Sequence, residues 1–175
     1  RSKAKMVNFG IIYSISAFGL AQRLDIPRKE AATLIENYFI QYPKIKNYMS
    51  ETLVFARENG FVKTLKGRRR YLKDINSQNA TVRGYAEREA INAPVQGSAA
   101  DLIKIAMIDI HNEFRTKKLQ SKMTLQVHDE LVFDVLKNEV EIVKPIIHSC
   151  MVNAFKTSVP LEAEIGVGEN WLDAH

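Results

Sequence analysis

The sequence of 175 residues predicts an α+β fold that is mostly helical and contains a small antiparallel sheet. Residues 1–59 have helical composition interrupted by proline, which indicates several consecutive helices. The stretch SAADLIKIAMIDIHNEF, residues 98–114, repeats apolar residues at helical spacing. The stretch MTLQVHDELVFDV, residues 123–135, places two apolar runs around a tight acidic turn, as in a pair of antiparallel strands.

Composition limits the class of protein. The apolar fraction of 46% and the charged fraction of 26% are ordinary for a globular domain. A net charge of +5 favours a polyanionic partner such as nucleic acid. Cys150 is the only cysteine, which excludes a disulfide framework and a thiolate zinc site and fits a reducing cytosol. No apolar run reaches the length of a membrane span, and the first residues lack a signal-peptide pattern.

Three helices are expected in the first third of the chain. The first covers residues 1–24, and Pro27 suits the first turn of the second. The second runs to Pro43, and the third ends at Gly60. The period then changes at FVKTLKGRRRYL, which predicts a basic hairpin that turns at Lys66-Gly67.

Two further helices are expected on either side of residues 94–97. Residues 79–92 return to helical composition and stop near Pro94 and Gly97. Ser98 followed by Asp101 then has the form of a capping box that starts a new helix. The predicted buried stripe of this helix is Ala99, Ile103, Ala106, Ile110 and Phe114.

The last part of the chain predicts a helix and a strand. Asn138 is expected to cap the helix, and Pro145 predicts a kink or a late start. LEAEIGV, residues 161–167, is expected to close the fold as a strand. The sequence shows no internal repeat or flexible linker.

Four residues of the first helix stand at i, i+4 spacing: Arg1, Lys5, Phe9 and Tyr13. On a helix they span roughly 120° of the surface, so two cations and two aromatic rings share one stripe. One interpretation is a binding surface. The alternative is a helix whose aromatic rings enter the core while its cations extend to the solvent at the edge.

The acidic turn has an unusual composition. A two-residue hairpin turn normally contains glycine or asparagine, but here the bend is expected at Asp129-Glu130. Two adjacent carboxylates repel each other, and a hard cation such as Mg²⁺ would relieve the repulsion because it takes oxygen ligands. The alternative is an acidic hairpin tip in solvent.

A polar stripe lies in REAINAPVQGSAAD, where Arg88, Asn92 and Gln96 stand at i, i+4 and i+8. Arg, Asn and Gln are suited to contacts with phosphates and with base edges. An ordinary polar helix face explains them equally well.

Taken together, these stretches resemble a known family. RSKAKMVNFGIIYS resembles the fingers-helix motif of family A DNA polymerases, the bacterial polymerase I type. REAINAPVQGSAAD is similar to the template-contacting helix of that family, and LQVHDELVFDV to its palm carboxylate motif. The order of the motifs matches, and IPRKEA, LKGRRRYL and GENW also fit, so the resemblance spans essentially the whole chain. It implies fingers with a basic hairpin in residues 1–75, and a template-contacting helix with the C-terminal palm in residues 76–175.

The resemblance implies a nucleotide site on the opening stripe. Arg1 and Lys5 would bind the triphosphate of the incoming nucleotide, Arg as a planar fork and Lys as a point charge. Lys5 would also act as general acid toward the leaving pyrophosphate. Phe9 would pack against the sugar, and Tyr13 would stack at the template position.

The resemblance also implies a metal site and a DNA interface. Asp129 would bind Mg²⁺ with Glu130 nearby, in a two-metal site for nucleotidyl transfer to the primer 3′-hydroxyl. His128 would contact the primer end. The template strand and the minor groove would contact Arg88, Asn92 and Gln96. The implied partners are primer-template DNA and a dNTP, without a membrane, for a monomer in the bacterial cytoplasm at the nucleoid.

Two departures from the family pattern stand out. Ser14 occupies a position where the family usually has glycine, which bears on how freely Tyr13 moves. The other catalytic aspartate of the family precedes the fingers, and neither it nor a thumb is recognisable here. We therefore expect the chain to be a piece of a longer enzyme and to be inactive by itself.

Three other classes of protein remain as alternatives. Single-subunit phage-type RNA polymerases share related motifs, but they typically have serine after the aspartate, where this chain has Glu130. A nucleic-acid-binding module would use the basic stripes and no metal. A metal nuclease would use similar carboxylates, but no water-activating base stands beside them in the sequence.

Overall fold

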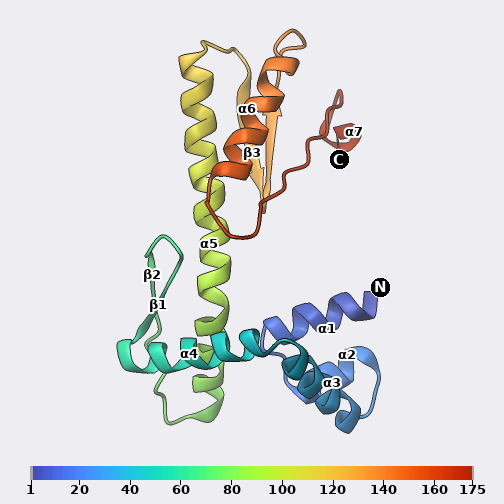
Figure 1. Cartoon of the computed structure of the whole chain (residues 1–175), viewed down its shortest axis with the longest axis vertical. Helices are drawn as coiled ribbons and strands as arrows, with labels where there is room; N and C mark the ends of the chain where they lie inside the picture. The colour runs from blue at the N-terminus through green and yellow to red at the C-terminus, as the bar shows by residue number, and fades with distance from the viewer. Residues whose placement is uncertain (1, 175) are drawn as a thin grey trace. The chain divides into compact units, whose positions relative to one another are not determined.

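The computed structural model describes residues 2–174, which form two compact units that divide between Gly97 and Ser98. The elements, shown in Figure 1, are α1 (Ser2–Ile12), α2 (Ala17–Leu24), α3 (Arg28–Gln41), α4 (Pro43–Asn59), β1 (Phe61–Lys63), β2 (Arg69–Tyr71), α5 (Ala80–Thr116), β3 (Lys122–Val127), β4 (Glu130–Asp134), α6 (Val140–Asn153) and α7 (Trp171–Ala174). The predicted α+β fold is confirmed: helices dominate, and each unit contains one two-stranded antiparallel sheet. Among the described residues no helix is both long and apolar enough to cross a lipid bilayer.

The single helix expected over residues 1–24 is wrong, because the chain breaks after Ile12 and restarts at Ala17. Ser14 has a φ of 59°, which is left-handed and cannot continue a right-handed helix. Ser16 then caps α2 by accepting a hydrogen bond from the Gly19 N–H at 3.1 Å. A core of small and aliphatic residues joins α2 to α3: Leu20, Ala21, Leu24 and Ala31.

The boundaries of the next two helices agree with the sequence. Pro27 directly precedes α3, and Gly60 ends α4 with a left-handed φ of 74°. The basic hairpin is also confirmed, with β1 and β2 antiparallel. Its turn lies one residue earlier than expected, because the Gly67 N–H donates to the Thr64 carbonyl at 2.9 Å and Gly67 itself has a φ of 84°.

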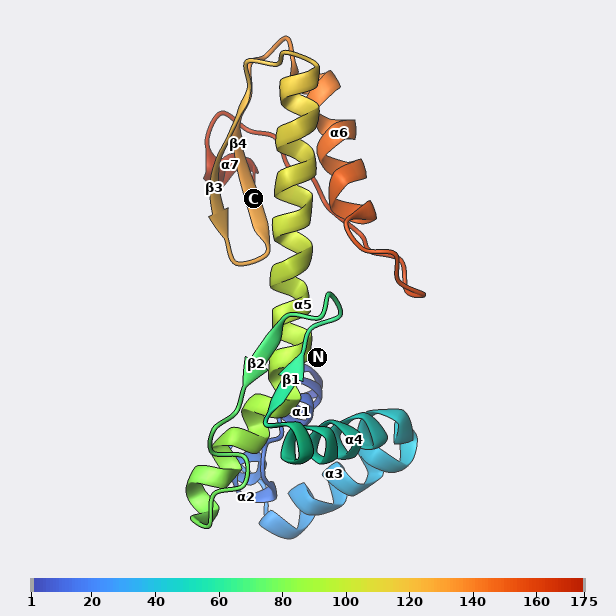
Figure 2. The same cartoon turned by 90° about the vertical axis from the view of Figure 1, so that its left-hand side faces the viewer.

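The expected stop near residues 94–97 is wrong, and so is the capping box, because α5 runs through both without interruption. Pro94 removes one backbone donor, but a helix of 37 residues keeps the bonds on either side. The hairpin supports this segment: Arg68 donates to the Gly97 carbonyl at 3.0 Å. A Cβ at Gly97 would lie 2.6 Å from Thr64 Cγ2, so glycine allows the hairpin to approach the helix (Figure 2).

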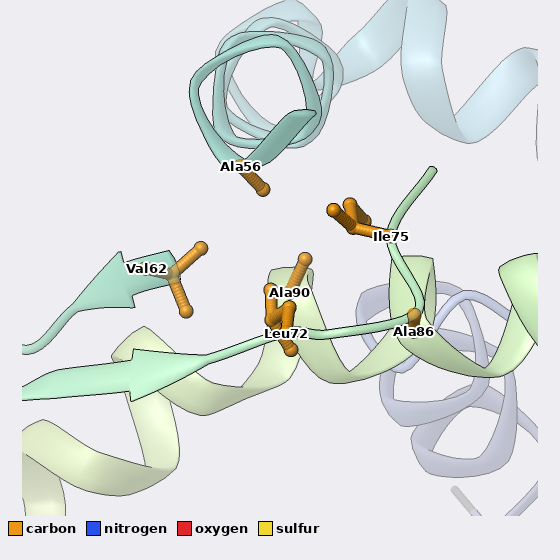
Figure 3. Packing of buried hydrophobic residues seen from close by; sticks show 6 residues of the cluster. All are labelled: Ala56, Val62, Leu72, Ile75, Ala86 and Ala90. Atoms are coloured by element: carbon orange, nitrogen blue, oxygen red, sulfur yellow. The ribbon is translucent and has the colours of Figure 1, made fainter. Parts of the chain in front are cut away.

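One apolar cluster holds α4, the hairpin and the start of α5 together. Figure 3 shows its side chains converging from the three segments: Ala56, Val62, Leu72, Ile75, Ala86 and Ala90. Three of the six are alanine, which allows the backbones of α4 and α5 to approach closely. The cluster therefore holds the part of α5 that belongs to the first unit, including Arg88.

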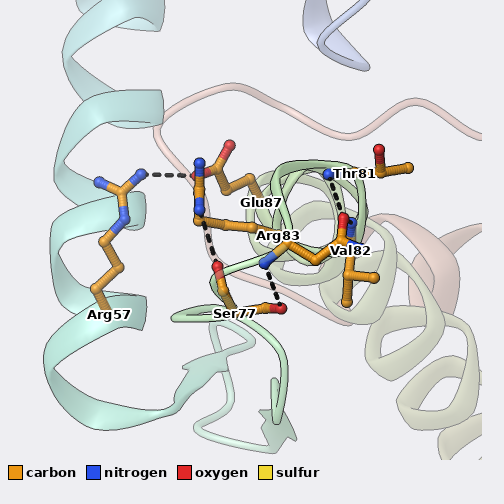
Figure 4. Close-up of polar contacts among 7 residues, drawn as sticks. Arg57, Ser77, Thr81, Val82, Arg83 and Glu87 are labelled. Atoms are coloured by element: carbon orange, nitrogen blue, oxygen red, sulfur yellow. Dashed lines mark hydrogen bonds and ion pairs between the residues drawn. The ribbon is translucent and has the colours of Figure 1, made fainter.

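Polar contacts fix the first turn of α5 against α4. The Asn79 carboxamide accepts bonds from the Thr81 N–H at 2.9 Å and the Val82 N–H at 3.3 Å, which caps the helix. Figure 4 shows Arg83 donating to the Ser77 carbonyl at 2.8 Å, and Arg57 pairing with Glu87 at 2.8 Å.

The second unit packs the C-terminal half of α5 against the β3–β4 hairpin and α6 (Figure 2). Its buried centre is Ile110, Phe114 and Val143. Four positions of the predicted stripe are buried, whereas Ala99 is exposed and that expectation is wrong: Ile103, Ala106, Ile110 and Phe114. The stripe thus begins one turn later than the pattern indicates.

Two expectations for the end of the chain are wrong. Glu139, not Asn138, is the residue that directly precedes α6. The Glu139 carboxylate accepts hydrogen bonds from the backbone N–H groups of Gln120 and Ser121, which precede β3. α6 begins at Val140 and continues through Pro145. LEAEIGV forms no strand, because the β3–β4 sheet offers it no pairing in the described chain.

Candidate functional site

The exposed face of α1 brings three of the predicted residues together. The Phe9 and Tyr13 rings stack with centroids 6.4 Å apart and an interplanar angle of 13°. The Lys5 ammonium lies 5.7 Å from the Phe9 centroid. Phe9 is 50% and Tyr13 43% exposed, so the alternative in which these rings enter the core is wrong. Arg1 lies outside the described residues.

The opposite face of α1 explains why this stripe is free. Ile11 is only 2% exposed, and Met6 and Val7 pack against the α2–α3 core. A Cβ at Gly10 would lie 3.1 Å from Ile15 Cγ2, so glycine lets the loop after α1 fold back closely. The helix is thus anchored on its apolar side and presents its cation and aromatic rings outward.

A pocket of ≈ 720 Å³ opens over this face within the first unit. Its lining comes from α1, the loop after it, α2 and α5: Lys5, Met6, Phe9, Gly10, Tyr13, Ser14, Ile15, Ser16, Arg23 and Arg88. The pocket therefore combines three cations with two aromatic rings. Such a lining suits a ligand that carries both phosphates and a planar base.

Two of the cations come from different sequence segments. Arg88 is one of the predicted template-contacting residues, and its guanidinium lies 4.6 Å from the centroid of the Tyr85 ring. Arg23 was missed by the sequence analysis, because a lone arginine in the last turn of an amphipathic helix has no distinguishing neighbour. Only the fold brings it into the same pocket as Lys5.

The other two residues of the polar stripe stand further along α5. Asn92 is half-buried and Gln96 is exposed, and neither lines the pocket. The Tyr48 hydroxyl donates to the Ile91 carbonyl at 3.0 Å, which holds this part of α5 against α4. Burial raises the pKa of Tyr48 above its ordinary value, so the phenol stays protonated as the donor.

The acidic hairpin is present in the second unit, but its bend is displaced by one residue. Glu130 is the first residue of β4 and pairs with Val127, so the turn residues are His128 and Asp129. His128 has the left-handed φ of 53° that the turn needs. Gln126 donates from its side chain to the His128 carbonyl at 3.1 Å and supports this conformation.

The chemistry of the turn suits a hard cation in part. Asp129 is exposed and Glu130 is half-buried, and both offer oxygen donors. Within residues 2–174, however, no group of three His, Cys, Asp or Glu side chains is close enough to hold a metal ion. By their chemistry the two carboxylates fit one part of a metal site and do not form a complete one by themselves.

One chain thus carries a pocket lined by cations and aromatic rings and, in its second unit, an acidic hairpin. The model of DNA polymerase family A matches residues 1–173, and the chain belongs to that family. Two of the relatives that it resembles are bacterial enzymes. DNA polymerase I of Caldicellulosiruptor bescii is 53% identical over 173 residues, which cover 99% of this chain and 20% of that protein. DNA polymerase I of Geobacillus stearothermophilus is 49% identical over 174 residues, with the same coverage of each chain.

A solved structure has the same fold. It is the POL domain of Pol1 from M. smegmatis in complex with DNA primer-template and dNTP. It matches with a TM-score of 0.96 and 42% identity, and the match covers 99% of this chain and 30% of that one. The chain spans about a fifth of the length of the curated relatives it matches.

Proposed function

We propose that this chain is the nucleotide-binding and template-contacting part of a DNA polymerase that adds deoxynucleotides to a primer 3′-hydroxyl. The observation that carries the proposal is the pocket in which Lys5, Phe9 and Tyr13 lie with Arg88. Residues 1–75 act as the fingers portion, and residues 76–175 supply the template-contacting helix and the C-terminal palm.

The incoming nucleotide binds along the exposed face of α1. Lys5 and Arg1 hold its triphosphate, and Lys5 can deliver a proton to the pyrophosphate as it leaves. Phe9 packs against the sugar. Tyr13 provides a planar face at the template position, since nearly half of its surface is accessible.

The primer-template contacts follow from the polar groups of α5 and the β3–β4 turn. Arg88, Asn92 and Gln96 bind the template strand and the minor groove, where similar acceptors recur in every correct pair. His128 contacts the primer end from the exposed turn. These contacts test the shape of a base pair without reading its sequence.

Asp129 would hold Mg²⁺, with Glu130 as the neighbouring carboxylate. The metal, when bound, supplies charge stabilisation for the transferring phosphoryl group. Asp129 is presented at the tip of a hairpin whose strands pack on α5, which restricts where its carboxylate can lie. We assign the polymerase to the bacterial cytoplasm at the nucleoid, where its DNA is. We also propose that it acts as a monomer.

A chimera tests the proposal. The matching 174 residues of the Geobacillus stearothermophilus enzyme are replaced by this chain, and primer extension is measured. We expect extension by the chimera and its loss in Lys5→Ala, with Lys29→Ala, an exposed lysine of α3, as the control that keeps activity. A chimera that binds DNA and stays folded but does not extend would contradict the assignment.

The chain by itself is expected to show no extension, because within residues 2–174 no third His, Cys, Asp or Glu side chain joins Asp129 and Glu130 to form a metal site. The purified 175-residue chain, freed of host polymerase, is assayed on the same primer-template. Extension by the chain alone would show that the two carboxylates suffice.

A further inference from the structure

The β1–β2 hairpin has two faces of different character. Residues alternate between the faces of a strand, and cross-strand partners share a face. Val62, 2% exposed, and its partner Arg70 face α5, where Arg70 pairs with Glu89 at 3.0 Å. Phe61 and Lys63 therefore project away from α5 together with their partners, which are Tyr71 and Arg69.

Aromatic rings and cations interleave on this second face. The Phe61 ring contacts Phe55 of α4 with centroids 5.7 Å apart and Tyr71 with centroids 5.8 Å apart, both edge-to-face. The Arg69 guanidinium lies 4.6 Å from the Phe61 centroid, and the Lys63 ammonium lies 5.4 Å from the same centroid. We call these five residues the outer face.

The outer face is accessible and its charge is not neutralised. Tyr71 is 65% and Phe55 38% exposed, values that are high for rings in a folded domain. No carboxylate within the described chain forms an ion pair with Lys63 or Arg69, whereas Arg70 on the other face has Glu89. Cation–π contacts hold both cations near the rings and leave their N–H donors available for a ligand.

We propose that the outer face binds single-stranded nucleic acid. Bases that are not paired stack on exposed rings, and the phosphates between them meet Lys63 and Arg69. Duplex DNA offers the same phosphates but keeps its bases stacked on one another. The exposed rings of the outer face therefore favour a single strand. The outer face shares no residue with the pocket, and this proposal therefore goes beyond the nucleotide site.

Binding of a fluorescent oligo(dT) measures the interaction, with the 175-residue chain and with the chimera. The Lys63→Gln/Arg69→Gln variant should lower the slope of log affinity against log salt by about 1.4, since each phosphate on a single strand contributes about 0.7. Lys44→Gln, which removes an exposed cation from the start of α4, is the control and should lower it by less than half as much.

The rings are tested separately from the charges. Tyr71→Ala should weaken binding at least about fivefold, the smallest effect of losing one base stack. Tyr71→Phe keeps the ring and should bind as the parent does, which separates stacking from loss of the hairpin. Tyr42→Ala, another exposed ring of the same unit, should leave the affinity within twofold. Equal affinities for the Tyr71→Ala and parent chains, with both folded by circular dichroism, would overturn the proposal.

Two experiments with the chimera distinguish whether the bound strand is the template of the same primer-template or a separate strand. A primer-template with a long 5′ overhang is compared with one that has a short overhang, and each with free oligo(dT) as competitor. A gain from the long overhang that Tyr71→Ala removes identifies the template strand; displacement of labelled oligo(dT) without such a gain identifies a separate strand. If 5-iodouracil photocrosslinks reach only α1 and never Phe55 or Tyr71, the proposal fails, even when primer extension proceeds.

Discussion

The α1 pocket and the acidic hairpin differ in how much of each site the described chain supplies. The pocket draws its lining from three helices and a loop, and the α2–α3 core anchors its principal helix. The acidic hairpin offers two carboxylates at a turn, and residues 2–174 bring no third acidic, His or Cys ligand to them. The pocket is thus assembled within a single unit, whereas the described residues place only Asp129 and Glu130 at the acidic turn.

The difference reflects the chemistry of each ligand. Phosphates and bases are bound by long cations and flat rings, which one packed helical unit can supply from several segments. Mg²⁺ takes six oxygen ligands in an octahedral arrangement, of which one or two carboxylates supply a part and waters and substrate phosphates supply the rest. We therefore expect nucleotide binding to persist when the β3–β4 turn is changed, and we expect turnover to be lost.

The largest expected effect is that of Asp129→Ala in the chimera. The carboxylate would hold a metal that stabilises charge developing in the transition state, so kcat should fall at least about a hundredfold while primer-template affinity stays within twofold. Single-turnover extension and anisotropy measure the two quantities. Asp134→Ala, at the far end of β4, is the control. An Asp129→Ala rate within tenfold of the parental rate would remove this residue from the mechanism.

Phe9→Tyr adds a phenolic OH to the pocket and tests whether Phe9 lies at the sugar of the incoming nucleotide. A dideoxynucleotide lacks the 3′-hydroxyl that bonds to its own phosphate, and the phenolic OH can supply that bond. A hydrogen bond to a charged group is worth about 1.5–3 kcal/mol, so use of dideoxynucleotides should rise roughly 10- to 100-fold. Because Phe9 is half exposed, the added hydroxyl should not lower stability.

The ratio of kcat/KM for dideoxynucleotides and deoxynucleotides decides this prediction. Phe18→Tyr, an exposed phenylalanine of α2 that does not line the pocket, provides the matched control and should keep the parental ratio. The same ratio in Phe9→Tyr and the parent would place Phe9 outside the nucleotide site.

The sequence predicted most elements because local signals decided them. Gly60 ends α4 and Gly67 follows the turn of the β1–β2 hairpin, each with a left-handed φ that glycine adopts without steric cost. The i, i+4 spacing likewise predicted that Lys5, Phe9 and Tyr13 share a face, since that spacing is a property of the helix itself.

The errors arise where contacts distant in sequence outweigh local signals. Pro94 and Gly97 indicate a helix end, but the hairpin 29 residues earlier contacts Gly97 through Arg68 and favours a continuous α5. Asn138 is the better helix cap by residue type, yet Glu139 occupies the cap position, and its carboxylate accepts a hydrogen bond from the Gln120 N–H before β3. Arg23 joins the pocket only through the packing of α2, so no spacing rule could have found it.

Glu139→Gln tests whether the stability of the second unit depends on hydrogen bonds to the Glu139 carboxylate, while the α1 pocket does not. The carboxylate accepts bonds from the Gln120 N–H at 3.0 Å, the Ser121 hydroxyl at 2.5 Å and the Ser121 N–H at 2.9 Å. These bonds lower the pKa of Glu139 below its ordinary value of 4.5. The unfolded chain then binds the proton more readily, so this contribution to stability is present above pH 4.5 and is lost as the pH falls through the folded pKa.

Melting temperatures measured across the acidic range should therefore fall less steeply in Glu139→Gln than in the parent. Glu141→Gln, exposed on the first turn of α6, serves as the control and should retain the parental profile. Nucleotide binding at neutral pH should be unchanged in Glu139→Gln, because the pocket lies in the first unit. Parallel profiles for parent and variant would show that these hydrogen bonds do not contribute to stability.

The smallest expected effect concerns Ser14, in the wall of the pocket beside Tyr13. The Ser14 N–H donates to the Ile11 carbonyl and the Ile15 N–H to the Gly10 carbonyl, both at 2.8 Å, which is the pattern of a helix end that favours glycine. Ser14 instead carries a Cβ at a φ of 59°, a strain of about 1–2 kcal/mol, and its Oγ is buried without a hydrogen-bond partner among the described residues. Ser14→Gly relieves the strain but adds about 0.5–1 kcal/mol of chain entropy to folding, so the backbone should contribute a net gain of up to about 1 kcal/mol, or about 2–4 °C in Tm. Removal of the buried hydroxyl should add to this gain. Ser14→Ala keeps the Cβ and removes only the hydroxyl; a smaller gain from alanine than from glycine would assign the remainder to backbone strain, and a loss of stability in Ser14→Gly would show that α1 does not end in this conformation.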